Sequence, residues 1–256
     1  MTPSTMAHKG RLKQLGAVVF WLLVWQLGAA ALNQSFLLAS PLQTLAALLR
    51  LAGSWAFWHR VGFSALRILV GFAAAAGVGC LLAALSAAVQ LAQALVSPLM
   101  QLMKAVPVAS FIILALLWVR SSNLCTLIAF LMVLPVVYTA VLQGIKSTDA
   151  QLLEMAQVFR IPWQRALGAI WLPQVWPYFV QSCTVGMGLA WKSGIAAEVI
   201  GLPSGSLGEA LYQAKLYLET GELFACTVVI VAASTLCERL FLRLLAWLGR
   251  RWEVQP

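Results

Sequence analysis

Few side chains in this sequence of 256 residues could carry out catalysis or hold a metal ion. It contains eight acidic residues, two histidines and five cysteines. His8 and His59 are far apart in the sequence, and no two cysteines form the C-x-x-C pair of a zinc or redox site. Catalysis would require a cluster such as two carboxylates or a Cys–His pair, and the scattered acids do not supply one. We therefore expect no enzymatic activity, no metal and no cofactor.

One segment, GMGLAWKS at residues 186–193, is superficially similar to a nucleotide-binding loop. The phosphate-binding pattern is G-x-x-x-x-G-K-[ST], but Trp191 stands at the position of its second glycine. That loop binds phosphate through exposed backbone N–H groups, which a tryptophan within an apolar stretch does not present. The sequence therefore predicts that this chain binds no ATP.

Two charged residues, Lys192 and Glu198, lie within an otherwise apolar stretch. A charge in hydrocarbon costs roughly 2.5–3.5 kcal/mol on insertion scales, so such residues often line a path through the membrane or its gate. The alternatives are an ion pair inside the protein or a side chain that reaches the membrane interface. A direct pair along one helix is not expected, because residues six apart do not share a helix face.

The composition indicates an all-α protein that crosses a membrane several times. Hydrophobic residues make up 62% of the chain and charged residues 10%, whereas a soluble domain has roughly half and a quarter. The formal net charge of +9 comes from basic residues beside apolar runs, as in membrane proteins with basic cytoplasmic loops. No basic stretch alternates with aromatic residues, so nucleic-acid binding is not expected. We expect residues 1–256 to form one membrane domain.

Six apolar runs are long enough to be candidate spans. They cover approximately residues 15–32, 61–89, 107–119, 124–142, 178–200 and 223–248. The first run follows three basic residues and also resembles a secretory signal peptide, but its length and the later runs favour a retained span. Between the first two runs, Leu42, Leu45, Leu48 and Leu49 recur at helical spacing and predict a short interfacial helix.

The distribution of basic residues predicts that both termini lie in the cytoplasm. With six spans and the N-terminus inside, eleven of the 17 Lys and Arg residues are cytoplasmic. These are Lys9, Arg11, Lys13, Lys104, Lys146, Arg160, Arg165, Arg239, Arg243, Arg250 and Arg251. The loop at residues 201–222 falls outside and contains three acids and one base. This orientation places the loop at residues 144–173 in the cytoplasm.

The 144–173 loop contains a short amphipathic helix. Ser147, Thr148 and Asp149 offer capping side chains, and apolar residues then recur at helical spacing from Leu152 to Phe159. Pro162 ends this helix, and a second helical stretch covers residues 163–171. Such a helix can lie in the lipid interface or occupy a groove on a partner protein.

This loop resembles the EAA loop of binding-protein-dependent ABC transporter permeases. The family pattern is E-A-A, three residues, G, nine residues and I-x-L-P. The matching residues are Glu154, Met155 and Ala156, then Arg160, then Ile170, Trp171, Leu172 and Pro173. Met155 replaces the second-position alanine and Arg160 replaces the glycine, while Pro162 can supply a turn two residues later.

The resemblance extends from about Val61 to the end of the chain. Residues 104–107, KAVP, are similar to the basic-x-x-Pro segment before the third span. Residues 190–198 resemble the fifth span of the sulfonate, taurine and nitrate-type permeases. The resemblance implies the type I importer fold in a bacterial inner membrane.

The resemblance also implies partners and roles. In the family, the loop helix sits in a groove of a cytoplasmic ATPase subunit, and a periplasmic or lipid-anchored binding protein delivers the solute to two permease copies, here expected as a homodimer. Glu154, Ala156 and Arg160 would shape the loop, and Leu152, Met155 and Phe159 would face the ATPase. The alternative is that these apolar residues rest on the bilayer.

The expected function is therefore import of a small solute, with sulfonate-like or nitrate-like anions as candidates and ATP hydrolysis on the partner. The alternative function is a secondary transporter driven by an ion gradient, which would require paired acids in the membrane and repeat symmetry. The sequence shows one strong candidate acid, Glu198, and no clear inverted repeat.

Overall fold

The computed structural model describes residues 3–32 and 37–251, and their side chains from residues 16 to 32 and 37 to 250. Every regular element in these ranges is a helix. The α-helices are α1 (Pro3–Leu32), α2 (Pro41–Ala52), α3 (Trp55–Ala88), α4 (Gln90–Ala105), α5 (Val108–Ala115), α6 (Ser121–Lys146), α7 (Ala150–Val158), α8 (Trp163–Ala166), α9 (Leu172–Gly201), α10 (Leu207–Leu216) and α11 (Thr220–Arg251), and a π-helix, η1 (Leu167–Trp171), precedes α9. The expected basic side chains of Lys9, Arg11, Lys13 and Arg251 lie outside the described ones.

Among the described helices, α3, α6 and α11 are each long and apolar enough to cross a membrane. The apolar part of α1, Gly16–Leu32, is shorter. α9 has 30 residues and so extends about 45 Å at 1.5 Å per residue, but it is less apolar than the three spans. The all-α, multi-pass fold is thus confirmed, while the count of six spans and the orientation stay predictions.

The third expected span, at residues 107–119, is not one straight helix. α5 has eight residues, about 12 Å, and meets α4 at a bend of 103°. The bend occurs because proline disfavours the helical conformation in the residue before it, and Val106 accordingly has an extended backbone with φ −76° and ψ 130°. Together, α4 and α5 form a broken span or a re-entrant segment.

The described chain divides into two compact units, Met1–His59 with Ala210–Val229, and Arg60–Glu209 with Ile230–Pro256. In the first unit, the Ser40 side chain and Gln43 form a capping box at the start of α2. An ion pair between Arg50 and Glu222 joins α2 to the first turn of α11. The predicted topology places α2 and the first turn of α11 on the same side of the membrane.

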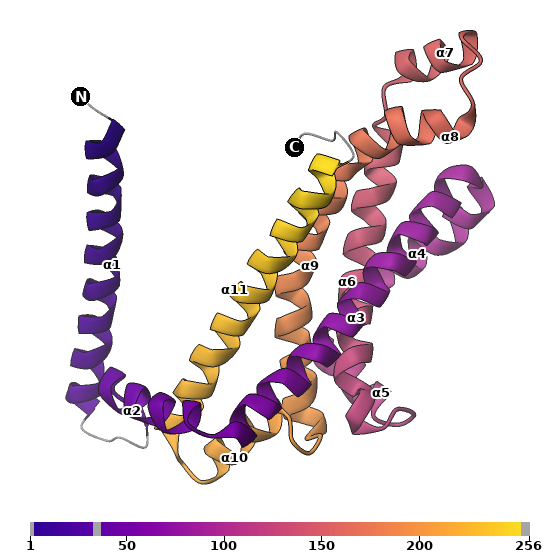
Figure 1. Cartoon of the computed structure of the whole chain (residues 1–256). Coiled ribbons are helices and arrows are strands. Elements are labelled where there is room, and N and C mark those ends of the chain that lie inside the picture. The colour runs from indigo at the N-terminus through magenta and orange to yellow at the C-terminus, as the bar shows by residue number, and fades with distance from the viewer. Residues whose placement is uncertain (1–2, 33–36, 252–256) are drawn as a thin grey trace. The chain divides into compact units, whose positions relative to one another are not determined.

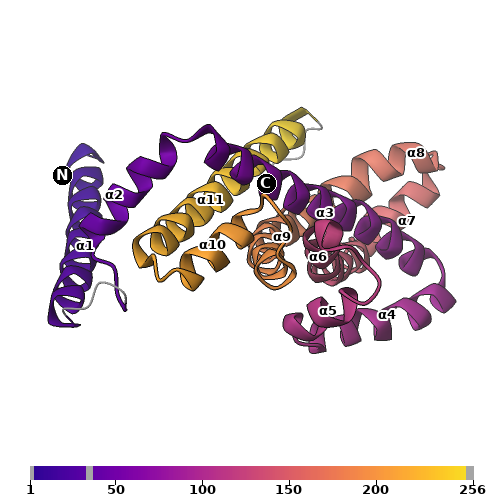
Figure 2. The ribbon, with the colours of Figure 1, turned by 90° about the horizontal axis from the view of Figure 1, so that it is seen from below.

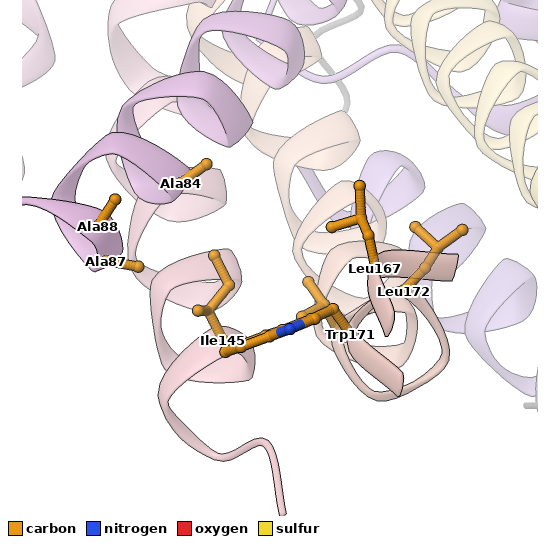
Figure 3. Close-up of a pocket in the computed structure, with 8 residues that line it drawn as sticks. Ala84, Ala87, Ala88, Ile145, Leu167, Trp171 and Leu172 are labelled. Atoms are coloured by element: carbon orange, nitrogen blue, oxygen red, sulfur yellow. The ribbon is translucent and has the colours of Figure 1, made fainter. Parts of the chain in front are cut away.

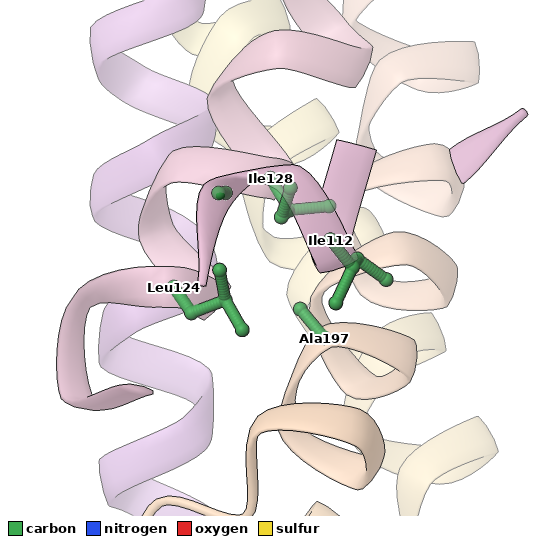
Figure 4. Close-up of a cluster of buried hydrophobic side chains, with 5 residues drawn as sticks. Ile112, Leu124, Ile128 and Ala197 are labelled. Atoms are coloured by element: carbon green, nitrogen blue, oxygen red, sulfur yellow. The ribbon is translucent and has the colours of Figure 1, made fainter. Parts of the chain in front are cut away.

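The second unit is built around α6 and α9, which lie side by side in both views of the chain (Figures 1 and 2). Their contact includes an apolar cluster in which Ile112 of α5 packs against Leu124, Ile128 and Ala197 (Figure 4). Small residues also let α3 pack closely against α6. A Cβ at Gly71 would overlap the Thr126 carbonyl oxygen, so the α3 and α6 backbones meet there.

Candidate functional site

The candidate coupling loop follows α6 and precedes α9, and its two short helices are α7 and α8 (Figure 1). The predicted cap is present, because the Asp149 side chain accepts a hydrogen bond of 2.8 Å from the Gln151 backbone N–H. Ala156 is 7% exposed and is the buried residue of α7. The sequence therefore located the start of this helix, while the buried position of Ala156 comes from the structure.

Arg160, which stands where the family pattern has glycine, has a positive φ of 48°. This left-handed conformation ends α7, because the Ile161 N–H turns back to the Ala156 carbonyl oxygen at 2.8 Å. Glycine adopts that conformation without a Cβ clash, which gives the physical reason for a glycine at this position. The turn is therefore made by Arg160 itself, and Pro162 follows it.

The I-x-L-P part of the motif forms the junction of the loop with α9. Residues 167–171 take the π-helical conformation, in which the Leu172 N–H bonds to the Leu167 carbonyl oxygen five residues earlier. Pro173 follows directly, and its ring crowds the carbonyl four residues before it in an ordinary α-helix. The wider π-turn gives room for this proline. Ile170 is 6% exposed and packs inward, while Leu172 and Pro173 are partly buried.

The base of the loop is attached to α9. The Asp149 backbone N–H donates a 2.9 Å hydrogen bond to the Gln174 side-chain oxygen. A Cβ at Gly144, near the end of α6, would lie 3.0 Å from the Tyr178 ring. The start of α7 is thus bonded to α9, and α6 and α9 are in close contact beside the base of the loop.

The outer surface of the loop is apolar and exposed. Phe159 is 72% exposed, Leu152 36% and Met155 41%, and their contact with a partner stays a prediction. Val158 and Trp163 are 78% and 71% exposed, and the sequence analysis did not assign them to this surface. We call these five side chains the exposed loop face. Glu154 and Arg160 are also exposed.

An apolar cavity of about 410 Å³ lies beside the π-helix. Ala84, Ala87 and Ala88 of α3 line one side, and Ile145, Leu167, Trp171 and Leu172 line the rest with Val175 (Figure 3). The small alanine side chains leave this space next to the junction of the loop and α9.

The two charged residues predicted for the pathway lie on different faces of α9. Lys192 is exposed, whereas Glu198 is 0% exposed. The exposed side chains of α9 also include Pro177, Gln181 and Val185. A lysine on a helix at membrane depth usually faces water or the interior of the protein, because its charge is costly in lipid.

Sequence comparison decides the family. The profile described as "Binding-protein-dependent transport system inner membrane component" matches residues 75–254. The chain belongs to this family. It is therefore a multi-pass permease of the bacterial inner membrane, of the sulfonate, taurine and nitrate type.

Several characterised or provisionally named permeases are similar over most of this permease. The putative aliphatic sulfonates transport permease of Bacillus subtilis (strain 168) is 25% identical over 90% of this chain and 83% of its own length. The taurine transport system permease of Escherichia coli (strain K12) is 27% identical over 90% and 86%. The bicarbonate transport system permease of Synechococcus elongatus is 22% identical over 77% and 69%.

Proposed function

We propose that this chain is the transmembrane subunit of an ATP-driven importer for a small anionic solute and acts as a single membrane domain. ATP hydrolysis takes place on cytoplasmic ATPase subunits, and a periplasmic or lipid-anchored binding protein delivers the solute. Two copies of the chain form a homodimer around the path. Family membership supports dependence on a binding protein.

The exposed loop face carries the proposed coupling role. Five apolar side chains project from a loop that has its own cap, its own turn and a hydrogen bond to α9. Large exposed apolar groups on an ordered loop are typical of a surface that a partner covers. Aromatic residues such as Phe159 and Trp163 are the kind that anchor protein interfaces. Docking of this face in a groove of the ATPase would let nucleotide binding move α6 and α9.

The exposed Lys192 of α9 supports the proposed path for the solute. The relatives' names specify sulfonates, taurine and bicarbonate, which are small molecules with anionic groups. Lys192 supplies a positive charge on the exposed face of α9, where an anion can reach it. Glu198 is buried in the state shown, so its proposed contribution is to the gate rather than to direct contact with solute.

The coupling role is tested by replacing the two aromatic anchors. Phe159→Ala and Trp163→Ala should each weaken ATPase binding by about 2 kcal/mol, roughly thirtyfold in Kd, as for anchor residues at interfaces. The measurement is the Kd between the purified permease in nanodiscs and the ATPase subunit. Trp118→Ala is the matched control, because Trp118 is 78% exposed but precedes α6, at the end of that helix away from the loop.

Unchanged affinity in both loop variants, or an equal loss in Trp118→Ala, would contradict the coupling role. Solute uptake by the intact system distinguishes ATP hydrolysis from an ion gradient as the energy source. Uptake that survives ATP depletion and stops with an uncoupler would contradict the ATP-driven mechanism.

A further inference from the structure

Glu198 is the centre of a buried polar cluster that the proposed coupling does not use. One carboxyl oxygen, Oε2, accepts a hydrogen bond of 2.7 Å from the Ser64 hydroxyl and one of 3.1 Å from the Gly208 backbone N–H. The Ser64 hydroxyl in turn accepts a 3.0 Å hydrogen bond from the Leu207 N–H. Side chains of α3 and α9 thus satisfy the first two N–H groups of α10.

This arrangement matches what the start of a helix requires. The first N–H groups of a helix have no partner within it, and an anionic group near them is favourable. Most helices meet this requirement with a residue next to the helix, as Ser206 does for the Glu209 N–H. In α10, a carboxyl group ten residues away and a hydroxyl 143 residues away do the same. The start of α10 is therefore held by tertiary structure.

The contact is also very close. A Cβ at Gly208 would overlap the Glu198 Cβ and the α9 backbone at Val199. Glycine at this position lets α10 approach α9 closely enough for the hydrogen bond from Gly208 to form. A small displacement of α10 would therefore break this bond.

Three buried side-chain nitrogen or oxygen atoms of the described residues have no hydrogen-bond partner, and two of the three belong to an acid and a base. These two are Oε1 of Glu198 and one terminal nitrogen of Arg67. Arg67 is one turn after Ser64 on α3, and its guanidinium lies over the Phe63 ring at 3.8 Å from the centroid. Unsatisfied buried polar groups are rare, and here an acid and a base lie close enough to interact electrostatically.

We propose that Glu198 is a positioning residue that holds the first turn of α10 against α3, and that it pairs with Arg67 when α10 moves away during transport. The movement rests on the proposed ATP-driven cycle, whereas the attachment of α10 does not. Two competing partners for one carboxyl group give an element with two discrete arrangements, as a transition between states requires. The closed arrangement uses Ser64 and α10, and the open one uses Arg67.

Cys125 provides a reporter within the chain. Its side chain is 0% exposed, and a Cβ at Gly194, one helical turn before Glu198, would lie 3.2 Å from its sulfur. In a parent protein with Cys80, Cys183, Cys226 and Cys237 replaced by alanine, only Cys125 reacts with N-ethylmaleimide. The labelling rate in membrane vesicles that contain the complete transport complex then measures opening of the cluster.

Three variants distinguish the attachment of α10 by Glu198 from the change of partner in which Glu198 pairs with Arg67. Ser64→Ala should raise the Cys125 labelling rate at least fivefold without nucleotide, because α10 loses one of its two attachments. Glu198→Gln retains an oxygen for Ser64 and Gly208, so α10 should stay attached. Because Glu198 interacts directly with the Cys125 thiol, labelling of this variant is compared with and without nucleotide within the same variant. Because the amide cannot form an ion pair, the increase in labelling with ATP and vanadate, and solute uptake, should fall at least tenfold. Arg67→Met should behave in the same way.

The double variant Arg67→Met/Glu198→Gln decides whether the two residues act as a pair. If they do, its uptake equals that of either single variant, because each already removes the interaction. Multiplied losses, normal uptake by Glu198→Gln, or protected Cys125 in Ser64→Ala would overturn the proposal. If ATP and vanadate do not change the Cys125 labelling rate of the parent, the ATP-driven cycle and the change of partner to Arg67 are refuted. Labelling of Ser64→Ala without nucleotide would still test whether the cluster holds α10.

Discussion

Arg160 offers a direct test of how the coupling loop is stabilised. Its φ of 48° places a residue with a Cβ in the left-handed region, which costs about 1–2 kcal/mol for residues other than glycine. The same residue ends α7, since its N–H bonds to the Gln157 carbonyl oxygen at 3.0 Å and the next N–H bonds to that of Ala156. Replacing Arg160 by glycine should therefore relieve the backbone without removing either hydrogen bond.

The expected size of the effect follows from two opposing contributions. Relief of the left-handed conformation stabilises the folded loop by about 1–2 kcal/mol. The greater freedom of glycine in the opened loop offsets about 0.4–1 kcal/mol of this. The net stabilisation by Arg160→Gly is thus roughly 0.5–1 kcal/mol, a two- to fivefold shift in the opening equilibrium.

Hydrogen exchange of the purified permease measures this shift without any partner. The amides of Arg160 and Ile161 should exchange two to five times more slowly in Arg160→Gly after correction for the intrinsic rates of the new sequence. Arg160→Ala is the control that removes the charge but keeps the Cβ, and it should exchange like the wild type. Arg160→Val should exchange faster, because a β-branched residue is especially unfavourable at positive φ.

The series also distinguishes backbone strain from charge. If Arg160→Gly and Arg160→Ala exchange alike, the Cβ is not the source of the strain. Faster exchange in both would mean that the guanidinium stabilises the turn, and the argument from φ would be refuted.

The remaining predictions concern packing and surface charge. Gly71→Ala should destabilise the protein by about 1–3 kcal/mol and lower its Tm by about 2–4 °C for each kcal/mol, because the new Cβ meets the Thr126 carbonyl. Gly77→Ala on the same helix meets nothing within 4 Å and should hold or raise Tm, so equal losses would refute the packing argument. The Arg50–Glu222 pair, with an Arg50 side chain that is 69% exposed, should contribute less than about 1 kcal/mol in a double-mutant cycle of thermal unfolding. A larger coupling energy, or one that does not decrease with added salt, would contradict the view of a solvent-screened pair.

The parts of the loop that the sequence predicted are those set by neighbouring residues. The cap at Asp149 and the helix that follows it depend on residues within one or two turns, and the structure shows both. The helix ends earlier than the predicted break at Pro162, because α7 stops at Val158 and Arg160 makes the turn. The π-turn before Pro173 has a local cause as well, but proline alone does not specify whether a helix bends, ends or widens. The bend of 103° before α5 is likewise caused by a proline. The sequence had predicted one span at residues 107–119 in its place.

The exposed loop face shows that helical spacing alone does not identify every exposed apolar residue. Leu152, Met155 and Phe159 of the helically spaced set are exposed and Ala156 is buried, while Val158, outside that set, is the most exposed of the five side chains at 78%. The end of α7 and the left-handed turn at Arg160 decide which apolar side chains face outward there. Trp163 belongs to the next helix, so its place on the same face depends on how the turn folds back.

The sequence by itself determined that this protein is helical and membrane-embedded, and that it carries a family motif on a loop, because apolar runs, capping residues and motif spacing are local features. Only the tertiary structure decided that Lys192 is exposed while Glu198 is buried, and that Glu198 holds α10. The Glu198 carboxyl and the Ser64 hydroxyl are 134 residues apart in sequence and 2.7 Å apart in space. No periodicity encodes such a pairing, since it results from how α3, α9 and α10 pack.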